Sequence, residues 1–132
     1  MIPDPTALAL ILCEQVLVDQ LSRNPSPINI FTGLAVQGFP SERQRFSVFA
    51  ALTDSQGDGR LELRAIRLDT GEQFYAQHYP IHFPDRPTVI NVNIRVRAVR
   101  FPVAGVYEFL LLVDGSLIAQ RRLRVYAAPS ST

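Results

Sequence analysis

The sequence predicts an all-β protein, a sandwich or barrel of about seven to eight antiparallel strands. Short runs rich in Val, Ile, Leu and Phe recur along the chain. Clusters of Gly, Pro, Asn and Asp separate these runs about every eight to twelve residues, as is typical of such folds. No segment shows sustained helical periodicity, and a composition of 47% apolar and 19% charged residues is that of a globular chain.

The strands follow from the apolar runs in order. The expected strands occupy residues 7–18, 28–36, 44–54, 60–69, 72–79, 88–99, 105–113 and 116–126. The clearest alternation lies at 90–98, where aliphatic residues share one face and Asn or Arg residues share the other. In LELRAIRL the alternation shifts between Ala65 and Ile66, which predicts a β-bulge.

Prolines and turn residues predict the connections. The stretch HYPIHFPDRP has three prolines that remove backbone donors, which predicts an edge strand or a connection. PSP at 25–27 predicts a rigid turn between the first two strands. Asp114-Gly115 predicts a type I′ hairpin turn.

Length predicts one domain over 1–132, with its core at about 7–126 and a disordered tail at 127–132. Cys13 is the only cysteine, which excludes an internal disulfide and indicates a reducing, cytoplasmic location. The apolar segment 7–13 follows MIPDPT, which lacks the positive charge of a signal peptide. We therefore expect a buried first strand there.

The charge composition excludes several classes of function. The 13 basic and 12 acidic residues nearly cancel, so we expect no binding to nucleic acid or to an anionic membrane. All the basic residues are Arg, and the absence of Lys excludes Schiff-base and P-loop chemistry. The pairs Arg95 with Arg97 and Arg122 with Arg124 predict a solvated strand face, with a phosphate or acidic-partner site as the alternative.

The stretch DSQGDG at 54–59 raises the question of a calcium loop. An EF-hand loop needs a bidentate Glu at position 12 and helices on both sides, but position 12 is Ala65 and the flanking runs are strands. The composition is that of a hairpin loop, so we expect no calcium site.

Aromatic and imidazole side chains cluster near the proline-rich stretch. His78 and His82 are four apart, and in extended chain this spacing is about 13 Å, too far for one metal ion. A small ligand or a carbohydrate could instead use Tyr75, His78, Tyr79 and His82. The serines and carboxylates form no catalytic motif, so we expect a protein that is not an enzyme and needs no cofactor or metal.

Three stretches resemble a known family. ILCEQVLVDQ followed by INIFTGLAV, and GVYEFLLLVDGSLIAQRRLRV at the end, are similar to a bacterial family of small stand-alone β-sandwich proteins of unknown function. The resemblance covers about residues 8–126 and implies an antiparallel Ig-like β-sandwich without a known activity. The loop RNPSPIN departs from the short Gly-Lys turn of the family. The matching positions are Cys13, Glu14, Gly105, Tyr107, Phe109 and Asp114-Gly115.

The last hairpin suggests an interaction surface. Both faces of GVYEFLLLV are largely apolar, which is typical of a strand covered on both sides. If strand 44–54 neighbours this hairpin, one outer patch would result, and either a partner or a segment of the chain itself would cover it. The expected interface residues are Phe49, Ala51, Leu110, Leu112 and Ile118, rimmed by Arg122 and Arg124.

These observations favour a non-catalytic binding or protein–protein interaction module that forms a homodimer through a sheet face. The small-ligand or carbohydrate-binding sandwich stays open as an alternative.

Overall fold

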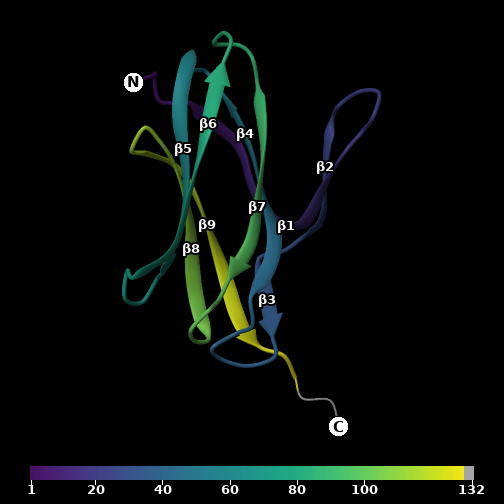
Figure 1. The fold of residues 1–132 in the computed structure, drawn as a ribbon, viewed down its shortest axis with the longest axis vertical. Helices are drawn as coiled ribbons and strands as arrows, with labels where there is room; N and C mark the ends of the chain where they lie inside the picture. Colours follow the sequence, from purple (N-terminus) through teal and green to yellow (C-terminus); the bar gives the residue numbers. More distant parts are fainter. Residues whose placement is uncertain (130–132) are drawn as a thin grey trace.

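Two β-sheets face each other in the computed structural model, which describes residues 1–129 (Figure 1). One sheet has four strands in the order β2-β1-β4-β7, and the other has five in the order β3-β9-β8-β5-β6. All paired neighbours are antiparallel except β3 and β9, which are parallel. The strands are β1 (Thr6–Val18), β2 (Pro25–Ile30), β3 (Gly33–Val36), β4 (Gln44–Thr53), β5 (Gly57–Arg67), β6 (Gln73–Phe83), β7 (Ile90–Val99), β8 (Gly105–Val113) and β9 (Ser116–Ala127).

The all-β class and a two-sheet arrangement are confirmed, and residues 1–129 contain no helix. The strand expected at 28–36 is wrong as a single element, because the chain crosses from one sheet to the other at Phe31 and Thr32. The predicted tail begins inside β9, which ends at Ala127. Residues 130–132 of that tail lie outside the described part of the chain.

The turn expected at Pro25–Pro27 is also misplaced. These residues begin β2, an edge strand that pairs only with β1, so two prolines without N–H groups are tolerated there. The turn lies before them, at 19–24, where the Asp19 carboxylate accepts hydrogen bonds from the backbone of Leu21 (2.8 Å) and Ser22 (2.9 Å). These bonds lower the pKa of Asp19.

Three local predictions are confirmed. Asp114 (φ 49°) and Gly115 (φ 85°) both have positive φ, as a type I′ turn requires. The β5–β6 register shifts between Ala65 and Ile66. β6, which contains Pro80, is the edge of its sheet.

The core lies between the sheets because the central strands alternate their side chains. In β4 and β8 every second residue is buried in one inter-sheet cluster, which includes Val48, Leu52, Phe109 and Leu111. Aromatic rings meet edge to face there; the Phe46 and Phe109 centroids, for example, are 5.8 Å apart. This packing fixes the two outer faces that remain for contacts with other molecules.

One segment leaves the sandwich. β1 pairs with β4 only as far as Cys13, and beyond that residue it pairs only with β2. We call residues 14–30 the arm. It consists of the end of β1, the turn at 19–24 and β2, and Figure 1 shows it projecting from the body at the β2 label. Leu17 is 52% exposed and Leu21 at the tip is 93% exposed. The arm therefore has little share in the core.

Candidate functional site

The structure does not bring the predicted interface residues together. β4 pairs with β1 and β7, so Phe49 and Ala51 lie on the outer face of the four-stranded sheet. Leu110 and Leu112 lie in β8 on the opposite side of the sandwich. The premise that strand 44–54 neighbours the last hairpin was wrong. β4 belongs to the four-stranded sheet, whereas β8 and β9 belong to the five-stranded sheet.

A bulge changes the rest of that prediction. The β8–β9 register shifts between Leu111 and Leu112, so that Leu112 faces Leu117. Leu117 is consequently 54% exposed, whereas Ile118 packs partly against the core. Strict alternation had placed Ile118 on the outer face with the expected interface residues.

The candidate ligand-binding residues are likewise divided between two faces. Tyr75 and Tyr79 pair in register with Ala65 and Leu61, which are core residues. Burial raises the pKa of Tyr75 to about 12, and its hydroxyl has no hydrogen-bond partner among residues 1–129. The two rings thus belong largely to the inner side of β6.

The two histidines point to the outer side and contact acidic residues of β5. His82 Nδ1 lies 2.8 Å from Asp58 Oδ1. His78 Nε2 lies 3.5 Å from Glu62 Oε2. The four residues therefore do not line one pocket, and residues 1–129 hold no group of three His, Cys, Asp or Glu arranged for a metal ion.

The outer face of the five-stranded sheet pairs its charges. Glu62 lies 2.7 Å from the Arg64 guanidinium, whose hydrogen bond lowers the pKa of that carboxyl. Arg122, which was predicted to rim an interface, lies 3.7 Å from Glu108, whereas Arg124 forms no ion pair within residues 1–129. The acidic residues on this face are thus matched by basic ones.

At one end of the four-stranded sheet, by contrast, arginines lie close together without ion pairs. Where β1 separates from β4, a groove of about 380 Å³ opens, and three arginines line it. None of these arginines forms an ion pair within residues 1–129. We call this groove the arginine groove; its lining is Glu14, Gln15, Val16, Arg45, Phe46, Ser47, Asn93, Arg95, Val96 and Arg97.

A second hollow of about 350 Å³ is also lined by Arg45, and its lining is more apolar than that of the arginine groove. Ile30, Phe31 and Leu34 line it, together with Phe46. Glu14 borders both hollows, and its carboxylate accepts a hydrogen bond of 2.5 Å from the Asn29 amide. The base of the arm therefore has a basic groove on one side and an apolar hollow on the other.

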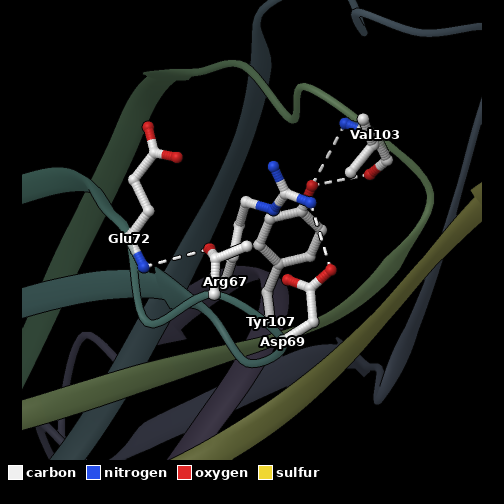
Figure 2. Close-up of polar contacts among 6 residues, drawn as sticks. Arg67, Asp69, Glu72, Val103 and Tyr107 are labelled. Carbon is white, nitrogen blue, oxygen red and sulfur yellow. Dashed lines mark hydrogen bonds and ion pairs between the residues drawn. The ribbon is translucent and has the colours of Figure 1, made fainter.

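A buried tyrosine holds the connection between β7 and β8. The Tyr107 hydroxyl donates to the Val103 carbonyl (2.6 Å) and accepts from the Val103 N–H (3.3 Å), as Figure 2 shows. Arg67 and Asp69, also in Figure 2, pair at 3.1 Å beside it. Burial raises the pKa of Tyr107. Its two bonds go to the backbone, so its role is structural.

The fold defines the chain as a two-sheet β-sandwich protein. The chain belongs to a family of unknown function (DUF6941), whose model matches residues 8–126. The predicted membership of an uncharacterised family is thereby confirmed. No curated protein sequence matches the chain. No helix within residues 1–129 has the length and apolar character needed to cross a membrane.

The sequence interpretation missed the arginine groove as a unit. Arg95 and Arg97 were recognised as sharing one strand face, but Arg45 lies about fifty residues earlier in the chain. The β4–β7 register, with Ser47 opposite Arg95, brings the three together. A residue pattern within one strand carries no signal for such a register.

Proposed function

We propose that this protein is a non-catalytic binding module that recognises a protein partner through the arm and the groove at its base. One observation carries the proposal: the arm presents apolar side chains on both of its faces. Leu17 and Val18 are neighbours on a strand and so point to opposite faces, yet both are more than half exposed.

Such an arm gains stability from a partner. A two-stranded ribbon without cover is marginally stable by itself, and β1 and β2 have only each other from Glu14 onward. Burying the exposed leucines against another protein would contribute about 25 cal/mol per Å² of apolar surface. Exposed apolar surface of this kind is typical of interaction sites.

The same proposal includes an Ig-like topology. The strand order β3-β9-β8-β5-β6 facing β2-β1-β4-β7 supports this proposal, with β2 as an added strand and one edge strand of an Ig-like sheet absent. Tyr107, near the start of β8, bonds to the backbone four residues upstream, as the tyrosine corner of these folds does. Proteins of this fold class share the same β-sheet framework, and their binding residues lie mostly on strand edges and loops. An exposed arm at the edge of the sheet therefore favours an interaction module.

The proposed setting is the cytoplasm, where a lone buried thiol stays reduced. Cys13 is free and fully buried, and burial raises its pKa. A self-associated form of the protein belongs to the same proposal, with the arm as the contact instead of the divided sheet face.

Site-specific photo-crosslinking tests the proposal. A benzophenone amino acid replaces Leu21 at the arm tip in one variant and Leu117 in a control variant. Leu117 is an exposed leucine in the β8–β9 hairpin, in a different part of the sandwich. Illumination in cells that naturally express the protein should yield a discrete adduct from position 21 and none from position 117.

Mass spectrometry then identifies the adduct, and an adduct of twice the chain's mass indicates self-association. Equal adducts from both positions, or none from position 21, would contradict the proposal. A second pair, Leu17→Ser and Leu117→Ser, checks the result: L17S should abolish the adduct from position 21, and L117S should leave it unchanged.

A further inference from the structure

We infer that the arginine groove, together with the open edge of β1 beside it, binds an acidic, extended segment of the partner as an added β-strand. The inference rests on the proposed function and names the chemistry of the partner. Three features of the described residues carry it: a free strand edge, an unpaired cluster of arginines, and their position on the same groove.

The first feature is the free edge. Between Glu14 and Val18, β1 has β2 on one side and no strand on the other among residues 1–129. Unpaired backbone groups on a strand edge are a template for an incoming extended peptide. Five residues of edge span about 17 Å, enough for a short strand.

The second feature is the charge. Arg95 and Arg97 alternate along β7 on one face, and Arg45 lies on the neighbouring strand β4. Like charges on neighbouring strands are unfavourable. The arginines of the five-stranded sheet that lie beside acidic residues, such as Arg64, are paired with them, whereas those of the groove have no acidic partner within residues 1–129. A carboxylate-bearing ligand would supply the missing counter-charge.

The third feature is the common position. Gln15 and Val16 of the free edge line the same groove as the three arginines. Side chains at alternate positions of an added strand point to one face of the sheet. Acidic residues at every second position would therefore reach the guanidinium groups, which match carboxylate geometry with two parallel hydrogen bonds.

Glu14 sets a condition on this binding. Its carboxylate also lines the groove and would repel an acidic ligand, but it accepts a hydrogen bond from Asn29, a residue that lines the apolar hollow. Removing the charge at this position should strengthen the binding of an acidic strand. The outcome is opposite in sign to that of removing the arginines, which makes the pair a useful test.

Fluorescence anisotropy at low ionic strength provides the measurement. The probe is a labelled ten-residue peptide of alternating Glu and Thr. A Gln-for-Glu peptide tests the charge, a peptide N-methylated at alternate residues tests the backbone hydrogen bonds, and inorganic phosphate tests whether a simple anion replaces the peptide.

Two triple variants carry matched changes in net charge. R45Q/R95Q/R97Q removes the groove arginines, and R121Q/R122Q/R124Q removes three exposed arginines from β9 in the other sheet. We expect the groove variant to lose at least about tenfold in affinity for the Glu peptide, because several charge-assisted hydrogen bonds disappear together. The β9 variant should change the affinity by less than about twofold.

The Gln peptide and the N-methylated peptide should both bind at least about tenfold more weakly than the Glu peptide, and E14Q should bind it more tightly. Equal losses in both triple variants would overturn the inference, because they indicate attraction by net charge alone. Undiminished binding of the N-methylated peptide, or full displacement by low-millimolar phosphate, would overturn strand addition. A failure here together with a crosslinked partner at Leu21 would leave the proposed function standing.

Discussion

The sandwich body and the arm are built from the same kind of strand, yet they differ in what their side chains meet. In the body, β4 and β8 each bury a full row of side chains between the sheets, and Glu62 and Glu108 on the five-stranded sheet each lie beside an arginine. In the arm, Leu17 and Val18 of β1 stay exposed, and the arginines at its base form no ion pair within residues 1–129. The body thus buries most of its apolar side chains between its own sheets, whereas the arm leaves apolar side chains exposed.

The contrast teaches that exposed residues of one type are not equivalent. Arg64 is part of a local ion pair with Glu62, and its charge is already compensated. Arg95 is opposite Ser47, and it forms no ion pair within residues 1–129. The register between strands, and not the residue type, decides between the two roles.

The largest expected effect separates the core from the arm. Phe109→Ala should lower the free energy of unfolding by about 3–5 kcal/mol, because the ring is fully buried against Phe46 and its loss leaves a cavity. Leu17→Ala in the arm should change it by less than about 0.5 kcal/mol. Urea unfolding followed by circular dichroism measures both, and a comparable loss in the two variants would contradict the division between body and arm.

The next effect concerns the buried polar group that holds the body's connection between β7 and β8. Tyr107→Phe removes the hydroxyl that bonds to Val103 and leaves the Val103 carbonyl without this partner, so we expect a loss of about 1–2 kcal/mol. Tyr126→Phe is the control, since that ring is 45% exposed. Thermal unfolding of both variants compares them, and an unchanged Y107F would mean that the hydroxyl adds nothing to stability.

A smaller effect, which depends on pH, tests the ion pair between Glu62 and Arg64 on the five-stranded sheet. The pKa of Glu62 is lowered below 4.5, first by the hydrogen bond from Arg64 and then by the nearby charges of Arg64, His78 and Arg60. A lowered carboxyl pKa contributes stability that is present above the unfolded value and is lost as the pH falls through the folded value.

Glu62→Gln should therefore be less stable than the wild type at neutral pH, by up to about 1 kcal/mol because solvent screens the pair. The difference should shrink as the pH falls below about 4.5. Urea midpoints measured from neutral pH down to acid follow this change. A difference independent of pH would show that the carboxyl stabilises the fold by packing and not by its charge.

The smallest expected effect sharpens the contrast in charge. R45Q/R95Q/R97Q should leave the free energy of unfolding unchanged or raise it slightly, by less than about 0.5 kcal/mol, because it relieves repulsion between like charges. Arg64→Gln should lower it slightly because Glu62 loses its closest partner. Chemical unfolding at low salt measures both, and a destabilised triple variant would indicate that the groove arginines support the fold.

Local patterns in the sequence were sufficient for most strands and for the Asp114-Gly115 turn. The hairpin loop expected at 54–59 was wrong, because this loop joins β4 to β5 in the other sheet. Period-two alternation in β7 follows from the pleat of a single strand, and the Asp114-Gly115 turn follows from the positive φ that these two residues tolerate. The β5 bulge was likewise visible as a shift within one run. Each of these features depends on neighbouring residues in the chain.

Other features depended on which strands became neighbours. Phe49 and Leu110 have similar patterns, but hydrogen bonding to different strands places them on opposite sides of the sandwich. The run at 28–36 is continuous in sequence, yet one half pairs with β1 and the other with β9. The bulge in β8–β9 arises from pairing, and strict alternation therefore misassigned Ile118.

The sequence by itself thus determined the all-β class, the approximate strands, the Asp114-Gly115 hairpin turn and most alternating faces, because these follow from backbone sterics and the two-residue period of a strand. Only the tertiary structure decided the sheet order, the arm and the meeting of Arg45 with Arg95 and Arg97. The physical reason is that strand pairing joins residues far apart in the chain, and its register is selected by the packing of the whole core.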